Sequence, residues 1–165
     1  RQSIHTPDPA SFIEPKRRYY TRGHAAQTPT LGLHQARIAR SGEEVTLICY
    51  GPMVDTCLEA AKEASQEGRK LEVIDVRSLS PLDMATVYES VRRTTRAIVV
   101  QEAPRTQGVG AEIAARLGEE LYYVMEAPVL RVTGWSTPYP PAKAEGEHIP
   151  DVDRILDAVD RSLAF

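Results

Sequence analysis

Four short apolar runs, separated by helical patterns, constrain the fold of this chain more than any other feature of its sequence. They are 45–50 (VTLICY), 71–76 (LEVIDV), 97–100 (AIVV) and 128–133 (PVLRVT). Continuous apolar runs of this length are typical of strands buried on both faces, as in a parallel sheet. Strands that alternate with helices are joined by right-handed crossovers. We therefore predict an α/β fold, an open and mostly parallel sheet with helices on both faces.

Helical periodicity places four helices around these strands. The first is predicted over 54–66, and the second begins at Ser80–Pro81, with Ser80 as its N-cap. The third spans 107–117, and the fourth follows Asp151, whose side chain is suited to cap it.

The first 42 residues lack this regularity. Only 10–13 resembles a short strand, and 16–30 has neither a helical nor a strand period, so we interpret it as an extended linker. This segment holds seven Lys/Arg against two Asp/Glu, whereas residues 43–165 hold 13 against 21. A basic arm can bind nucleic acid, but this one lacks a recognition helix or stacking aromatics, so we predict no nucleic-acid partner. No apolar run is long enough to span a membrane, and no signal-peptide pattern is present.

Few residues suggest catalysis. Gly108-Val109-Gly110 follows a strand, but Ile113 breaks the dinucleotide-binding fingerprint, so we interpret the glycines as permitting close packing. Cys49 and Cys57 lie in apolar patterns and are predicted to be buried free thiols.

Two carboxylates and four histidines are the remaining candidates for catalytic or metal-binding residues. Asp75 and Glu102 lie near the C-terminal ends of the second and third predicted strands, at the edge where ligands bind in parallel sheets. Neither has a partner base in the sequence pattern, so we interpret them as turn-capping residues. The histidines lack the spacing of a zinc site.

Four segments together carry a family resemblance: 7–20 (PDPASFIEPKRRYY), 43–61, 71–117 with QEAPRTQGVGAEIAARL, and 126–143 (EAPVLRVTGWSTPYPPAK). They resemble the beta subunit of the thiamine-diphosphate-dependent 2-oxo acid dehydrogenases. The EAPRT and GWSTPYPP segments look more like the branched-chain member than the pyruvate member. The resemblance implies a transketolase C-terminal-domain-like fold over 30–165, preceded in 1–29 by the tail of a pyrimidine-binding domain and a linker.

The resemblance also implies what the chain does. Its parent would decarboxylate a 2-oxo acid oxidatively and transfer the acyl group to lipoamide, using thiamine diphosphate and Mg²⁺. The catalytic and cofactor-binding residues would lie on the alpha subunit or upstream of Arg1, so we expect a fragment that is inactive by itself. Its expected partners are the alpha subunit, a second beta subunit, and the subunit-binding domain of the dihydrolipoyl acyltransferase.

Two pairs of residues are assigned through the resemblance. Glu126 and Phe165 match the positions that dock the acyltransferase. Thr6 and Asp8 match a monovalent-cation site, for K⁺, although Thr6 replaces an acidic residue found in some members. The alternatives are the same region of a pyruvate dehydrogenase, or a transketolase or deoxyxylulose-phosphate synthase C-terminal domain. The expected location is the bacterial cytoplasm, or the mitochondrial matrix in a eukaryote.

Overall fold

A computed structural model gives the fold and describes residues 2–20 and 31–165, apart from the side chains of Gln2 and Arg17. The elements are, in chain order, α1 (Gln2–His5), η1 (Lys16–Arg18), β1 (Arg37–Arg40), β2 (Val45–Cys49), α2 (Met53–Gln66), β3 (Leu71–Asp75), α3 (Met84–Thr94), β4 (Ala97–Pro104), α4 (Val109–Leu121), β5 (Leu130–Gly134), η2 (Ala142–Ala144), α5 (Glu145–His148) and α6 (Val152–Leu163).

The strands form one sheet in the order β1-β3-β2-β4-β5. Strand β2 pairs in parallel with both β3 and β4, and β4 pairs in parallel with β5. All five residues of β2 are buried, as expected for a central strand that is covered on both faces. The predicted α/β fold with an open, mostly parallel sheet is confirmed.

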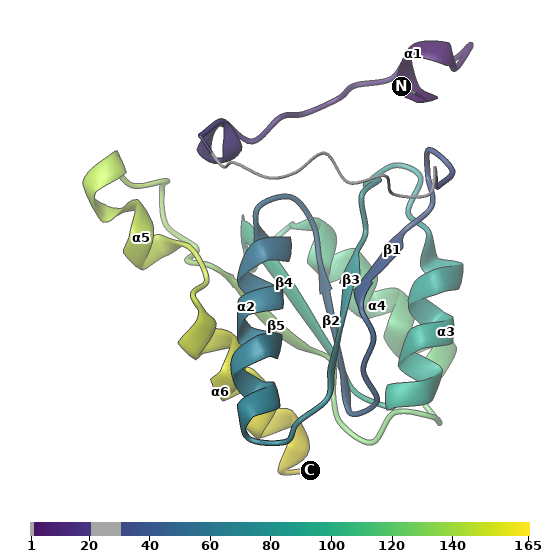
Figure 1. Ribbon diagram of the computed structural model, residues 1–165, viewed down its shortest axis with the longest axis vertical. Helices are drawn as coiled ribbons and strands as arrows, with labels where there is room; N and C mark the ends of the chain where they lie inside the picture. Colours follow the sequence, from purple (N-terminus) through teal and green to yellow (C-terminus); the bar gives the residue numbers. More distant parts are fainter. Residues whose placement is uncertain (1, 21–30) are drawn as a thin grey trace.

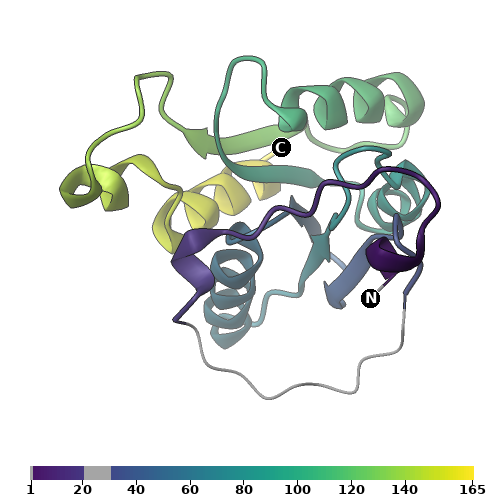
Figure 2. The same ribbon diagram turned by 90° about the horizontal axis from the view of Figure 1, so that it is seen from above.

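Helices cover both faces of this sheet (Figures 1 and 2). Because successive strand side chains point to opposite faces, Leu47 and Cys49 pack with α2 and α6 in one core, whereas Ile48 packs with α3 and α4 in the other. The two helix layers therefore account for the uninterrupted apolar runs in the sequence.

Strand β1 was not predicted. It lies at the edge of the sheet, antiparallel to β3, with a register shift between Ile38 and Arg40. Its sequence, RIAR, is short and half charged, which is typical of a protected edge strand rather than a buried one. Regular structure thus begins at Arg37, and the predicted boundary at Glu43 is wrong.

The second predicted helix begins later than expected. Ser80–Pro81 is a cis peptide in the preceding turn, and Asp83 is the N-cap of α3. The Asp83 carboxylate accepts from the backbone N–H of Thr86 at 3.2 Å and from that of Ala36 at 2.9 Å. Asp83, whose carboxylate accepts from two backbone N–H groups, therefore takes the N-cap position that was predicted for Ser80.

Other boundaries differ by a few residues. Strand β4 and helix α4 end four residues later than predicted, and β5 begins at Leu130 rather than at 128. Asp151 caps α6 as predicted, accepting from the backbone N–H of Arg154 at 2.8 Å.

The N-terminal segment lies beyond the end of the sheet from which α2 begins (Figure 1). The predicted strand at 10–13 is absent, because no neighbouring strand pairs with it, and Phe12 and Ile13 are exposed. An ion pair of 2.9 Å between Arg18 and Asp55 joins this segment to α2. Residues 21–30, most of the proposed linker, lie outside the described residues.

Candidate functional site

Arg96 organises the end of the domain that carries Glu126. It lies between α3 and β4, and its guanidinium donates from Nη1 to Glu126 Oε2 at 2.5 Å and from Nε to the carbonyl of Ser162 at 3.1 Å. The Arg96 side chain is only 18% exposed, whereas that of Glu126 is 57% exposed. One arginine therefore joins the predicted docking carboxylate to the last turn of α6.

The backbone also fixes Glu126. Helix α3 ends at Thr94, and its C-cap Thr95 adopts a left-handed conformation with φ of 57°. The carbonyl of Thr95 accepts from the backbone N–H of Glu126 at 3.0 Å. Pro128 then follows, and proline cannot continue a helix. The carboxylate is therefore presented from a turn that is held at two points.

Phe165 follows α6 at the same end of the domain, three residues after the Ser162 carbonyl that Arg96 contacts, and it is exposed. The structure thus connects Glu126 and the α6 terminus through Arg96, a residue that the sequence reasoning missed. The only sequence signal for this role is that an arginine and a glutamate lie 30 residues apart. Many other arginines and glutamates in the sequence are similarly separated, so this signal does not identify Arg96.

Three exposed apolar residues precede Glu126. Tyr122, Tyr123 and Val124 follow α4, and the two tyrosine rings make an edge-to-face contact with centroids 5.2 Å apart. Aromatic residues are enriched at protein interfaces. We name Tyr122, Tyr123 and Val124, together with the predicted docking residues Glu126 and Phe165, the candidate docking face.

The glycine loop before α4 has no room for a phosphate. Gln101 fills it, with Oε1 accepting from the Gly110 N–H at 2.7 Å and Nε2 donating to the carbonyl of Pro104 at 3.0 Å. A Cβ on Gly108 would lie 2.2 Å from Gln101 Nε2. The interpretation of these glycines as packing residues is confirmed.

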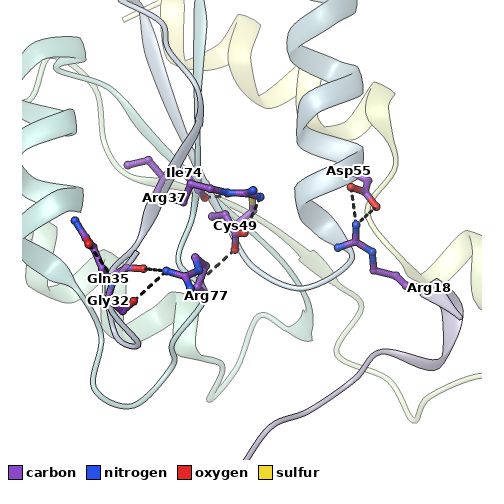
Figure 3. A network of polar contacts seen from close by, with 9 residues as sticks. Arg18, Gly32, Gln35, Arg37, Cys49, Asp55, Ile74 and Arg77 are labelled. Carbon is purple, nitrogen blue, oxygen red and sulfur yellow. Dashed lines mark hydrogen bonds and ion pairs between the residues drawn. The ribbon is translucent and has the colours of Figure 1, made fainter. Parts of the chain in front are cut away.

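Asp75 also has the structural role predicted from the sequence. It accepts from the backbone N–H of Arg77 at 3.1 Å and pairs with Arg37 at 3.1 Å. Arg77 in turn donates to the carbonyls of Gln35 and Gly32, which ties the chain before β1 to the turn after β3 (Figure 3). Glu102 lies in β4 and is partly buried.

The cysteines are unsuited to nucleophilic chemistry. Both are free and fully buried, as predicted. Hydrogen bonding with Cys57 and then burial raise the pKa of Cys49 well above its ordinary value. A thiol that resists ionisation is a poor nucleophile.

The described residues contain no cluster of metal-ligating side chains. Thr6 and Asp8 follow α1, but no group of three His, Cys, Asp or Glu side chains in residues 2–20 and 31–165 could hold a metal ion. Among the same residues, no helix is long and apolar enough to cross a membrane.

Comparison with known proteins places these features in a family. Residues 34–155 match the family model described as transketolase, C-terminal domain. The chain belongs to this family. The match spans the sheet from just before β1 into α6, so the transketolase C-terminal domain includes the edge strand that the sequence did not reveal.

Two curated relatives of this transketolase C-terminal domain are dehydrogenase beta subunits. The pyruvate dehydrogenase E1 component subunit beta of Leifsonia xyli subsp. xyli is 50% identical over 100% of the chain and 49% of the relative. The 3-methyl-2-oxobutanoate dehydrogenase subunit beta of Mycobacterium tuberculosis is 48% identical over 99% of the chain and 47% of the relative. The chain thus spans about half the length of these relatives.

Solved structures agree on the architecture. A split gene transketolase, described as an inactive beta4 tetramer, has a TM-score of 0.72 and 27% identity, over 84% of this chain and 44% of that one. A 2-oxoglutarate:ferredoxin oxidoreductase from Magnetococcus marinus has a TM-score of 0.50 and 16% identity, over 78% of this chain and 19% of that one. The second likeness concerns the fold alone.

Proposed function

We propose that the chain is the C-terminal assembly and docking region of the beta subunit of a branched-chain 2-oxo acid dehydrogenase. The parent enzyme would decarboxylate a 2-oxo acid with thiamine diphosphate and Mg²⁺ and pass the acyl group to lipoamide. Similarity to beta subunits along the whole chain supports this proposal. The pyruvate enzyme is the second candidate, because the relative at 50% identity acts on pyruvate by name.

The observation that carries the docking role is the arrangement around Arg96. Arg96 joins an exposed carboxylate to the last turn of α6, and two exposed aromatic rings lie shortly before that carboxylate in the chain. A small basic domain, such as the subunit-binding domain of the dihydrolipoyl acyltransferase, complements this face in charge, and the apolar rings supply contact area. The alpha subunit and a second beta subunit would complete the assembly through other surfaces.

The test of docking is calorimetry between the assembled enzyme and the acyltransferase's subunit-binding domain. Removing one member of a charge pair at an interface typically costs about 2–5 kcal/mol when the pair is buried and under about 1 kcal/mol at the rim. We expect Glu126→Gln and Tyr123→Ala each to weaken binding, and the Glu126 variant also to reduce its salt dependence.

Glu112→Gln is the matched control, since its side chain is 55% exposed and also pairs with an arginine, Arg116. Binding that is unchanged in both candidate docking-face variants, with intact melting curves, would show that another surface docks the partner. The substrate is tested separately, by comparing kcat/KM for 3-methyl-2-oxobutanoate and pyruvate in the complete enzyme. A strong preference for pyruvate would replace the branched-chain proposal by the second candidate.

The cation proposal concerns Thr6 and Asp8. A side-chain hydroxyl and a carboxylate are oxygen ligands of the kind that K⁺ accepts, but two ligands are too few by themselves, so the proposed site needs further oxygen ligands. If the site exists, K⁺ should raise the melting temperature of the complete enzyme more than Na⁺ does, and Asp8→Asn should remove the difference. Equal effects of the two ions in the unaltered protein would eliminate the proposal.

A further inference from the structure

A groove of about 450 Å³ lies along the free edge of the sheet, outside the candidate docking face. Its walls come from the loop after β4, from β5 and its C-terminal end, and from α6. Four arginines line it, Arg105, Arg131, Arg154 and Arg161, against two aspartates. The groove therefore carries an excess of positive charge in a chain whose net charge is negative.

Three of these arginines are not neutralised. Arg105 Nη1 donates to the carbonyl of Arg131 at 3.3 Å, and Arg131 Nη1 donates to the carbonyl of Arg105 at 2.9 Å. Arg154 Nη2 donates to the carbonyl of Thr133 at 2.5 Å. Carbonyls position these guanidinium groups without cancelling their charge, and no carboxylate within the described part of the chain forms an ion pair with any of the three.

Trp135 and burial hold Arg154 in place. Its guanidinium carbon lies 4.3 Å from the centroid of the Trp135 ring, and its Nη1 is buried without a hydrogen-bond partner among the described residues. A buried donor without a partner costs free energy that a ligand can recover after a small side-chain movement. Arg154 is thus held in place before any ligand binds, and its Nη1 can still donate a hydrogen bond.

The hydrogen bonds from Arg105 and Arg154 to the β5 backbone argue against the binding of a further strand at the β5 edge. Arg131 and Thr133 are two residues apart in β5, so their carbonyls point the same way. Strand β5 has a neighbour only on the β4 side. Because guanidinium groups already occupy both carbonyls, a peptide that extended the sheet would have to displace Arg105 and Arg154. A ligand is better bound through the side chains.

We propose that this groove binds a small molecule carrying a phosphate group. Arg105 and Arg131 would contact the phosphate, since the planar guanidinium matches phosphate oxygens in a two-point fork. Leu130 and Val132 line the same cavity and would contact the less polar part of the molecule. The volume lies within the range of about 300–1,000 Å³ that is usual for small-molecule sites.

The test is calorimetry of the intact protein, in the assembly in which it is purified, with inorganic phosphate and pyrophosphate as probes. We expect saturable binding that weakens with added salt. Arg105→Gln and Arg131→Gln should each weaken it by about tenfold, the usual effect of losing one hydrogen bond to a charged group. Asp157→Asn should strengthen it, because that carboxylate lines the groove and lies 3.7 Å from Arg161.

Arg116→Gln is the matched control, an exposed arginine on α4 outside the groove, and it should bind the probes like the unaltered protein. Melting curves verify that each variant is folded. The proposal is overturned if neither probe binds saturably, which includes the case of a groove covered by a partner subunit. It is also overturned if the arginine variants bind as tightly as the control, or if succinate, a dicarboxylate, binds as well as pyrophosphate.

Discussion

The guanidinium of Arg96 lies 2.5 Å from the carboxylate of Glu126, and this contact connects the turn before β5 to the last turn of α6. A half-exposed ion pair contributes little to stability by itself. The hydrogen bond from Arg96 Nε to the Ser162 carbonyl is different, because the side chain of Arg96 is mostly buried. The two partners of Arg96 should therefore respond differently to mutation.

Replacing Arg96 should destabilise the domain more than replacing Glu126. We expect Arg96→Gln to lower the free energy of unfolding by about 1–3 kcal/mol, the cost of leaving a buried polar group unpaired. Glu126→Gln should lower it by less than about 1 kcal/mol. Chemical denaturation measures both values, and equal losses would contradict the special role of the Ser162 contact.

Glu72 should be among the most sensitive polar positions. It is fully buried beneath α3, where it accepts from the Ser90 hydroxyl and pairs with Arg93 at 2.6 Å. Removing one partner of a buried ion pair costs about 3–5 kcal/mol. Because Arg93 is half exposed, we expect Glu72→Ala to fall at the lower end of that range in a denaturation experiment. Glu120→Ala, which removes a half-exposed partner of Arg92, is the control and should cost under about 1 kcal/mol.

Two glycines of α4 should respond in opposite directions to alanine. A Cβ at Gly110 would lie 2.7 Å from Gln101 Oε1, whereas a Cβ at Gly118 would meet nothing within 4 Å. We expect Gly110→Ala to destabilise the domain by about 1–3 kcal/mol through overpacking. Gly118→Ala should stabilise it by up to about 1 kcal/mol, because alanine favours the helix. Thermal melts of the two variants suffice, and a neutral Gly110→Ala would show that Gln101 moves freely.

Asp75 should make stability depend on pH in an unusual direction. Burial raises its pKa above the ordinary value of 3.8, although Arg37 and the backbone of Arg77 act in the opposite sense. The folded state therefore holds this proton more tightly than the unfolded state. The resulting stabilisation is complete below the unfolded pKa and is lost as the pH rises through the folded pKa.

Asp75→Asn removes this titration. Relative to the unaltered protein, the variant should gain stability as the pH rises from 3.8 through the raised pKa. Urea denaturation at a series of pH values measures the difference between the two proteins. A constant difference across that window would show that folding leaves the pKa of Asp75 unchanged.

The sequence predicted those elements whose pattern is local. The run at β2 is apolar throughout, because both faces are covered, and its bounds were correct to one residue. Strand β1 was not predicted because an edge strand can form through its hydrogen bonds to one neighbouring strand, without a distinctive sequence pattern. Its sequence, RIAR, shows neither a continuous apolar run nor a clear alternation of apolar and polar residues. The strand predicted at 10–13 is wrong for the opposite reason. The segment has apolar residues typical of a strand, but no neighbouring strand within the described structure pairs with it.

The site was predictable only in part. Family resemblance indicated Glu126 and Phe165, but not that Arg96 connects the turn of one to the helix before the other. Gln101 received no role from the sequence, yet it fills the glycine loop. The contacts of Arg96 and Gln101 join residues that are far apart in the sequence, and such contacts cannot be predicted from the periodicity of apolar residues.

The register shift in β1 has a consequence for solubility. A flat edge strand can pair with the same strand of another molecule, and such pairing is a route to aggregation. The shift between Ile38 and Arg40 interrupts the regular spacing of hydrogen-bonding groups along this edge, and Arg40 adds positive charge to it, whereas Arg37 is paired with Asp75. Two molecules that met along β1 would bring like charges together on mismatched ladders. The edge at β1 is therefore poorly suited to pairing with the same edge of a second molecule.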